Sequence, residues 1–225
     1  MSSPDTKTRI LDTAESLFAA QGFAATSLRA ITASAQVNLA AVHYHFGSKD
    51  ALLEAVFARR LVPMNEERLR RLHALEGQHG RGRVPLDQLI EAFLGPALEL
   101  SRDQARGGSR FVQLLGRSYT EPAPRLQEAV RSMYRKVIEY FKPAFQAVLP
   151  QLPDDELYWR LHFLVGVLAY CMSGSDMMRL IASCRMSDPL NVDALTKRLT
   201  AFLTAGMEAP MRSDAVSELA FSTSV

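Results

Sequence analysis

An all-α fold is predicted for this chain by two observations, and its composition predicts the size of its core. Apolar residues recur at intervals of three and four along most of the sequence, whereas the alternating pattern of half-buried strands is nearly absent. Glycine and proline supply most of the breaks between these segments. The chain has 225 residues, 48% of them hydrophobic, so it can build a substantial core in one or two domains.

The first two predicted helices are amphipathic. Gly22 ends the first as a left-handed stop signal, and either Thr26 or Ser27 can cap the exposed backbone amides that begin the second. The apolar positions recur at helical spacing, namely Ile10, Leu11, Ala14, Leu17 and Phe18 in the first helix and Leu28, Ile31 and Ala35 in the second.

A third, short helix follows almost at once, because only Gln36 and Val37 separate the second helix from residues 38–45. Val42 and the following Phe46 can pack inward, which leaves the other side chains of this helix outside. Two short helices joined by a tight turn are typical of the helix-turn-helix motif that reads DNA.

The fourth predicted helix begins directly after a glycine stop at Gly47. Ser48 can cap this helix, and Lys49 in its first turn can swing its long stem toward a phosphate. Pro63 is expected to kink or end the helix, as a hinge or as an ordinary stop, because proline removes a backbone hydrogen bond. The buried face of the helix is expected to carry Leu52, Leu53, Val56 and Phe57.

Residues spread over positions 7–60 form one recognisable set: Gly22-Phe23, Thr26-Ser27, Ile31, Ala35, Val37, Tyr44-His45-Phe46, Ser48-Lys49 and Leu52. Together they resemble the DNA-binding domain of TetR-family transcriptional regulators. The resemblance implies an N-terminal helix-turn-helix domain over residues 1–60, a helical effector-binding and dimerisation domain over 61–208, and a tail at 209–225 that we expect to be mobile.

The same resemblance implies which residues meet double-stranded DNA. The family directs Leu39, Ala40 and Ala41 at base edges, where their apolar side chains can meet thymine methyl groups. Arg29 either reads guanine or contacts a phosphate. His43 replaces the family's usual tyrosine and can donate to a phosphate when neutral or protonated, which can make binding pH-dependent. The implied DNA contacts are Thr26, Ser27, Arg29, Asn38, Leu39, Ala40, Ala41, His43, Tyr44, His45 and Lys49.

Composition narrows the remaining possibilities. A formal net charge of +2 gives no general support for DNA binding, so the placement of the cations must decide. Lys7 and Arg9 are either arm contacts or solvated surface residues.

Two cysteines, Cys171 and Cys184, are too few for a disulfide framework, and the first ten residues lack a signal-peptide core, so we expect a reduced, cytoplasmic protein. No metal or cofactor is expected, because the histidines show no ligand spacing.

Further helices are predicted beyond the fourth. Residues 77–85 are the clearest loop, 102–109 form another break, and the apolar run 161–172 is too short to span a bilayer. The expected helices are 86–101, interrupted by Pro96, then 110–118, 125–148, one that starts at Asp154 or Asp155, and a last one after 188–189.

These later helices carry no catalytic signature, so we expect no enzyme activity. They can line an apolar effector pocket that includes a few polar groups, although ordinary core packing explains the same residues. The candidate lining residues are Phe93, Phe111, Leu114, Leu115, Arg117, Met133, Tyr134, Val137, Phe141 and His162.

The last two long helices carry adjacent apolar ridges. The family resemblance implies that they pair with their copies across a two-fold axis, and packing within the chain is the alternative. A dimer would present two reading helices and require a roughly palindromic operator. The candidate interface residues are Leu161, Leu164, Val165, Leu168, Met172, Leu195, Leu199 and Phe202.

The expected function is a repressor that a small amphipathic effector releases from its operator. Residues 38–49, 159–163 and 172–174 resemble PsrA-type regulators of lipid metabolism, which implies a fatty acid or acyl-CoA effector. A drug-responsive regulator of an efflux pump is the competing hypothesis. A helical ligand-binding dimer that does not read DNA is a third, and it would bind ligand without salt-sensitive DNA association.

Overall fold

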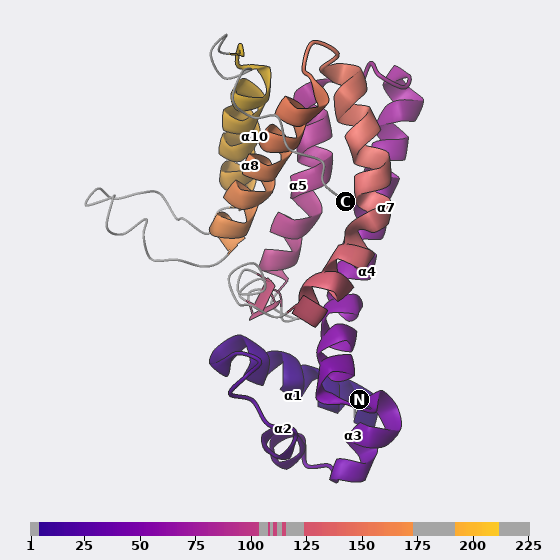
Figure 1. The fold of residues 1–225 in the computed structure, drawn as a ribbon, viewed down its shortest axis with the longest axis vertical. Coiled ribbons are helices and arrows are strands. Elements are labelled where there is room, and N and C mark those ends of the chain that lie inside the picture. The colour runs from indigo at the N-terminus through magenta and orange to yellow at the C-terminus, as the bar shows by residue number, and fades with distance from the viewer. Residues whose placement is uncertain are drawn as a thin grey trace, which may run out of the picture.

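The computed structural model describes residues 5–103, 108, 110, 111, 114, 115, 124–172 and 192–211. Over these ranges the secondary structure is helical and contains no strand, which confirms the predicted all-α class (Figure 1). The helices with printed bounds are α1 Thr6–Gln21, α2 Leu28–Ala35, α3 Leu39–Phe46, α4 Lys49–His79, α5 Leu86–Arg102, α7 Pro124–Val148, α8 Asp154–Met172 and α10 Val192–Glu208.

The first three helices form a small unit around the beginning of α4 (Figure 1). Its centre is apolar, and its fully buried side chains come from each of the three helices. Burial of one such side chain contributes about 1.5–3 kcal/mol, so this small core can hold the helices at fixed angles. The fully buried residues of α1 to α3 are Ile10, Ala14, Phe18, Ile31 and Val42.

Side-chain caps fix where α2, α3 and α4 begin. The side-chain oxygens of Ser27, Asn38 and Ser48 accept hydrogen bonds from the backbone N–H three residues later, at 3.1, 2.8 and 3.1 Å. Each cap satisfies a backbone amide that the helix itself leaves unpaired, which is worth about 1 kcal/mol. Of the two capping candidates for α2, the structure therefore selects Ser27 over Thr26.

Helix α4 is 31 residues long and runs from the small unit into the upper helical bundle (Figure 1). The expectation that Pro63 could end this helix is wrong, because α4 continues through it, and α5 likewise continues through Pro96. Leu61 and Met64 are both buried beside Pro63, so tertiary packing holds the helix across the missing hydrogen bond. The loop expected from residue 77 begins only at Gly80.

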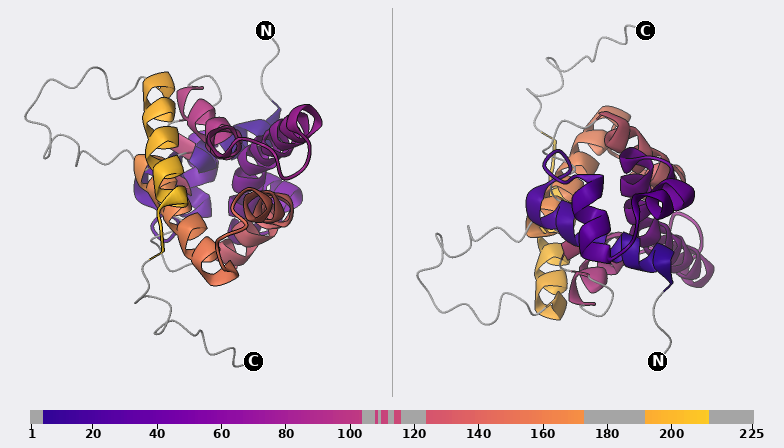
Figure 2. Two further views of the ribbon diagram at one scale, coloured as in Figure 1. Left: turned by 90° about the horizontal axis from the view of Figure 1, so that it is seen from above. Right: turned by 90° about the horizontal axis from the view of Figure 1, so that it is seen from below.

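The upper bundle packs α4 against α5 and α7, and it packs α5 against α8 and α10. Figures 1 and 2 show α10 along one outer edge of this bundle, on the side away from α4 and α7. Helix α4 therefore contributes to both units, whereas α8 and α10 present outer faces on the other side of the bundle.

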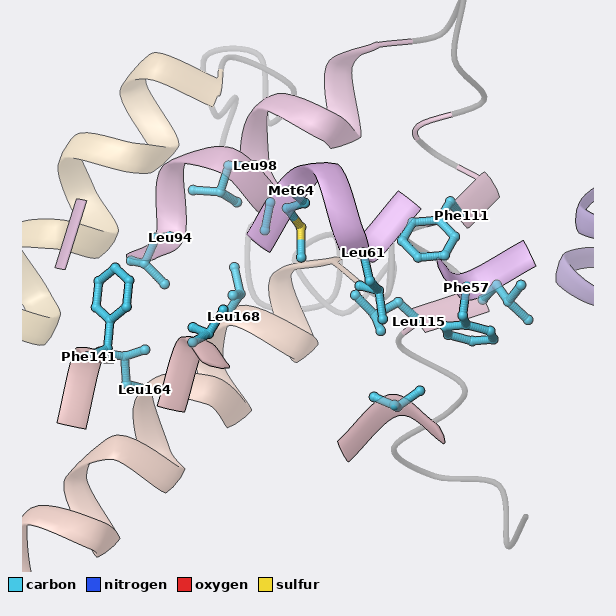
Figure 3. Close-up of a cluster of buried hydrophobic side chains, with 14 of the residues drawn as sticks. Phe57, Leu61, Met64, Leu94, Leu98, Phe111, Leu115, Phe141, Leu164 and Leu168 are labelled. Atoms are coloured by element: carbon cyan, nitrogen blue, oxygen red, sulfur yellow. The ribbon is translucent and has the colours of Figure 1, made fainter. Parts of the chain in front are cut away.

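One continuous apolar core extends from the small unit into the bundle. Figure 3 shows how side chains of α4, α5, α7 and α8 point toward this shared interior. The rings of Phe57 and Phe111 meet edge to face near the junction of the two units, with centroids 5.6 Å apart. The residues labelled in Figure 3 are Phe57, Leu61, Met64, Leu94, Leu98, Phe111, Leu115, Phe141, Leu164 and Leu168.

Two further findings, on membrane-spanning helices and on metal sites, apply to the described ranges. There, no helix is both long and apolar enough to cross a membrane, and no group of three or more His, Cys, Asp and Glu side chains could hold a metal ion. Arg117, Cys184 and residues 212–225 of the expected tail lie outside the described residues, and the side chain of Met172 is not described.

Candidate nucleic-acid interface and effector pocket

The turn between α2 and α3 is built from one left-handed residue. Gln36 has φ 54° and ψ 47°, and it is the one non-glycine residue with positive φ in the described part of the chain. Arg9 braces this turn, because its guanidinium donates to the carbonyls of Ala35 at 2.5 Å and Gln36 at 3.0 Å. The cation also complements the negative end of the α2 dipole. Arg9 is therefore neither a solvated surface residue nor a free arm.

Helix α3 presents most of its surface to solvent. Its one fully buried side chain is Val42, whereas Leu39 is 40% exposed and Tyr44 is 85% exposed. The ring of Tyr44 meets that of His45 edge to face at 5.1 Å between centroids. An apolar and aromatic face of this kind, projecting from a rigid helix, suits a contact surface more than a solvated one.

His43 is exposed on the same helix, and its hydrogen bonding restricts what it can donate. Its Nδ1 lies 2.9 Å from the carbonyl oxygen of Gly47. Because a carbonyl can only accept, Nδ1 must carry the hydrogen, and Nε2 of the neutral ring is then an acceptor. Only the protonated ring has an Nε2–H for a phosphate. Donation from the neutral ring to a phosphate, the other expected possibility, would require the contact with Gly47 to break.

The remaining predicted DNA contacts lie on α3 itself and near the starts of α2 and α4. Ser27 and Arg29 are exposed at the start of α2. Lys49 lies at the start of α4, with its ammonium 4.3 Å from the centre of the Phe23 ring.

Thr26 is fully buried, and its hydroxyl donates to the carbonyl of Gly22 at 2.8 Å, so it fixes the α1–α2 connection and is absent from the surface. Asn38 and Ala40 are exposed, while Ala41 and His45 are half-buried.

A half-open cavity of about 360 Å³ lies between α4, α5, α7 and α8. Of the predicted pocket residues, Phe93 and Tyr134 line it. Arg68 of α4 also lines it, although the sequence reasoning missed this residue. Arg68 shares a face with Leu61 and Leu72, so a lone arginine on an apolar helical stripe was the signal available.

The other predicted pocket residues lie elsewhere. His162 lines a separate cavity between α8 and α10, and Met133 is half-buried beside the first cavity's wall without lining it. The predicted residues that belong to the packed core are Phe111, Leu114, Leu115, Val137 and Phe141.

The outer face of α8 and α10 contains that second cavity, which measures about 590 Å³. Its rim exposes Phe163 by 58% and Phe202 by 68%. Leu161, Val165 and Leu195 of the predicted interface are half-buried. The three predicted residues whose side chains face the interior of their own chain are Leu164, Leu168 and Leu199.

An ion cluster joins α1 to α4 at the junction of the two units. Glu15 is 3% exposed and accepts hydrogen bonds from Arg59 at 2.6 Å and from Arg60 at 3.0 Å. Arg59 also pairs with Asp12 at 2.6 Å. Because Glu15 and Arg60 have little solvent access, their charged hydrogen bonds fix the position of α1 against α4 strongly.

Helix α3 is exposed, Arg9 braces the left-handed turn that precedes it, and Ser48 caps the supporting helix α4. Together these features define a helix-turn-helix protein of the DNA-binding class. The family model described as bacterial regulatory proteins of the tetR family matches residues 10–56. A second model, described as the tetracyclin repressor-like C-terminal domain, matches residues 91–206. The chain belongs to the TetR family, whose members are DNA-binding transcription factors rather than enzymes.

Individual relatives agree with this family. UidR of Escherichia coli strain K12, an HTH-type transcriptional regulator, is 39% identical over 51 residues, which are 23% of this chain and 26% of UidR. The match thus spans about a quarter of that relative.

Solved structures share the fold along most of the chain. The SmeT–triclosan complex is 22% identical, with a TM-score of 0.62, over 92% of this chain and 96% of that one. The fatty acid degradation regulator FadR from Bacillus halodurans is 12% identical, with a TM-score of 0.59, over 92% and 99%.

Proposed function

We propose that this protein is a homodimeric transcriptional repressor that binds a palindromic operator and leaves it when a small amphipathic effector binds. The observation that carries the proposal is the exposed face of α3, held at a fixed angle by the Gln36 turn and its Arg9 brace. A helix presented in this way fits the major groove. Action on the bacterial chromosome would place the protein in the cytoplasm.

The surface around α3 suggests how the operator is contacted. Leu39 and Ala40 at the start of the helix lie where a recognition helix meets base edges, and their apolar side chains suit thymine methyl groups. Arg29 reaches either a guanine or a phosphate. Tyr44 and Lys49 are suited to the backbone, because they flank the helix and carry a hydroxyl and a cation. Protonated His43 would add a further phosphate contact.

A second copy of the chain is the proposed occupant of the outer face of α8 and α10. Phe163 and Phe202 are large apolar side chains that solvent would otherwise cover, and they border a cavity that a partner's side chains could fill. To read one palindrome, a dimer formed on this face must hold two copies of α3 about 34–36 Å apart, one turn of DNA.

The proposed effector is a fatty acid or an acyl-CoA bound in the cavity between α4, α5, α7 and α8. The lining is mostly apolar but contains the buried cation of Arg68, which matches an amphipathic anion. FadR, a structural neighbour, is described as a fatty acid degradation regulator. The complex of SmeT with triclosan supports the competing drug-responsive hypothesis, since it places a small molecule on the same fold.

Helix α4 offers a route from the cavity to the DNA. It carries Lys49 at its start beside α3 and Arg68 in the cavity wall, within one unbroken helix. An effector that binds one tilt of α4 more tightly would shift the two reading heads away from operator spacing.

The test is a selection of genomic DNA fragments. Delipidated protein would be incubated with sheared DNA from the source organism at near-physiological salt, and the bound fragments sequenced. Enrichment of one imperfect palindrome, reversed by added decanoate, supports the proposal. Recovery without any common sequence would contradict it and would favour a ligand-binding dimer that does not read DNA.

A further inference from the structure

Arg68 is a buried cation in the wall of the cavity between α4, α5, α7 and α8. Its side chain is 1% exposed to solvent. The neighbours that share the cavity wall are largely apolar or aromatic, and they include Phe93, Val130 and Leu168. A guanidinium cannot lose its charge in a protein, so this site keeps a full positive charge in apolar surroundings.

The charge of Arg68 has no carboxylate to balance it within the described ranges. Its Nε donates to the carbonyl of Phe93 at 2.7 Å, and its Nη1 donates to the side-chain oxygen of Asn65 at 2.9 Å. Both acceptors are neutral. Arg160, the other buried arginine, differs because Glu156 accepts from its Nε at 2.7 Å. Burial of a cation without a counterion is costly, and Arg68 is the described residue that bears this cost.

Two aromatic rings hold the guanidinium in place without neutralising it. Its central carbon lies 4.5 Å from the centre of the Phe93 ring and 5.5 Å from that of Tyr134. Cation–π contacts of this kind orient the planar group and offset part of its desolvation. A guanidinium has five N–H donors, and two of those on Arg68 have partners among the described residues. The remaining donors are suited to a bidentate acceptor.

We infer that Arg68 binds the anionic group of the effector, and that this effector is a free carboxylic acid with an apolar body. The inference rests on the proposed effector site. A free acid places its carboxylate directly on the tail that fills an apolar cavity, where Arg68 can accept it as a counterion.

An acyl-CoA fits the cavity less well. Its tail ends in a neutral thioester, and its charges lie on phosphates farther away. The other cation in the lining, Arg131, is 72% exposed at the rim and pairs with Glu128 at 3.2 Å. The described lining therefore offers one uncompensated cation, and it is the one inside.

An effector bound at Arg68 would act on α4, the helix that connects the cavity to the helix-turn-helix unit. The side-chain oxygen of Asn65 accepts from Arg68, and its amide donates to the carbonyl of Met133 on α7 at 3.0 Å. A carboxylate that engages Arg68 changes this α4–α7 link, which gives the effector a preference for one placement of α4.

Calorimetry on the delipidated full-length protein, without DNA, tests the inference. The probes are decanoate, decanol and decanoyl-CoA, which share one tail. Decanoate should bind roughly ten- to a hundred-fold more tightly than decanol, as expected for charged hydrogen bonds. Equal affinity for decanoate and decanol, or tighter binding of decanoyl-CoA than of decanoate, would overturn it. Because no DNA is present, either result leaves operator recognition to its own assay.

Variants localise the effect. Arg68→Met should lower decanoate affinity to that of decanol and leave decanol binding unchanged, whereas Arg68→Lys should keep part of the preference. Arg135→Met, an exposed arginine on α7 outside the cavity, is the matched control and should behave as wild type. Retention of the full preference in Arg68→Met would refute the assignment. If Arg68→Met does not fold, the three-probe comparison on wild type still decides whether the effector is a free acid, and the partial loss of preference expected for Arg68→Lys tests the residue.

Discussion

At the scale of single residues, we expect His43 to make operator binding depend on pH. Its Nδ1–H is committed to the Gly47 carbonyl, so only the protonated ring can donate from Nε2 to a phosphate. We therefore expect operator affinity to weaken as the pH is raised from about 5 to about 8.

The measurement is fluorescence anisotropy of labelled operator across that pH range at constant salt. His43→Tyr restores the residue that the family usually carries and donates from a hydroxyl, so its affinity should change much less with pH. An identical pH dependence in wild type and His43→Tyr would exclude His43 as its source.

Glu67 gives a second pH-dependent prediction, which concerns stability. Hydrogen bonds from Arg70 and Arg71 lower the pKa of Glu67 from its ordinary value of 4.5 to about 2. Because the folded-state pKa is depressed, the carboxylate stabilises the fold above about pH 5 and loses this effect as the pH falls toward 2. Glu67→Gln should lower the free energy of unfolding by less than about 1 kcal/mol near neutral pH, since the pairs are partly solvated.

Urea denaturation at about pH 7 and about pH 3 checks this expectation. The difference between wild type and Glu67→Gln should shrink at the lower pH. Glu66→Gln, its exposed neighbour on the same helix, is the control and should show little change. A Glu67→Gln deficit that grows on acidification would contradict the prediction.

Local chemistry determined which single residues could be predicted from the sequence. Ser48 and the inward Val42 follow from capping preference and helical period, and both are as expected. Arg9, Thr26 and Arg68 were not predicted in their roles, because each acts on residues of another element. A side chain that reaches across the fold leaves no periodic signal in its own segment.

At the scale of elements, a cluster of ion pairs joins α1 to α4. Glu15 is almost fully buried and pairs with both Arg59 and Arg60, while Asp12 also pairs with Arg59. Glu15→Gln should lower the free energy of unfolding by about 3 kcal/mol, because it leaves two cations without their shared partner. Thermal and urea unfolding measure the loss, with Glu54→Gln on the exposed side of α4 as the control. Equal stability of the two variants would show that the cluster does not hold α1 in place.

The positions of the helices could be predicted better than their ends. The apolar period located α1, α2, α3, α7 and α8 to within a few residues, because each buries one clear stripe. It failed where tertiary packing overrides a local breaker, at Pro63 in α4 and Pro96 in α5. The length of α4 matters most, since one continuous helix joins the DNA-facing unit to the cavity.

At the scale of the whole molecule, the outer face of α8 and α10 should hold the dimer together. Phe202→Glu places a charge on the most exposed large apolar residue of α10 and should convert the dimer to monomer at micromolar concentration. Sedimentation velocity measures this change. Tyr140→Glu, which changes an exposed aromatic residue on α7, should remain dimeric. A dimeric Phe202→Glu together with a monomeric Tyr140→Glu would move the interface to α7.

Which apolar residues of α8 and α10 are buried within their own chain could not be predicted from the sequence. Leu164, Leu168 and Leu199 have the same helical spacing as the exposed residues, but they are buried within their own chain. An apolar stripe predicts that a helix face is buried, but it does not predict whether the same chain or another chain buries it. The cavity illustrates the same limit, because the predicted lining was mostly packed core.

The central claim is that the exposed face of α3 reads DNA, and one pair of substitutions tests it most directly. Ala40 on α3 and Ala74 on α4 are both exposed helical alanines, so Ala40→Glu and Ala74→Glu add the same charge to similar backbones. Binding to the selected operator would be measured by anisotropy for both variants. We expect Ala40→Glu to weaken binding at least about a hundred-fold, because the phosphates and the acceptor atoms on the base edges repel a carboxylate in the groove. Ala74→Glu should stay within a few-fold of wild type. Undiminished operator binding by Ala40→Glu would contradict the account.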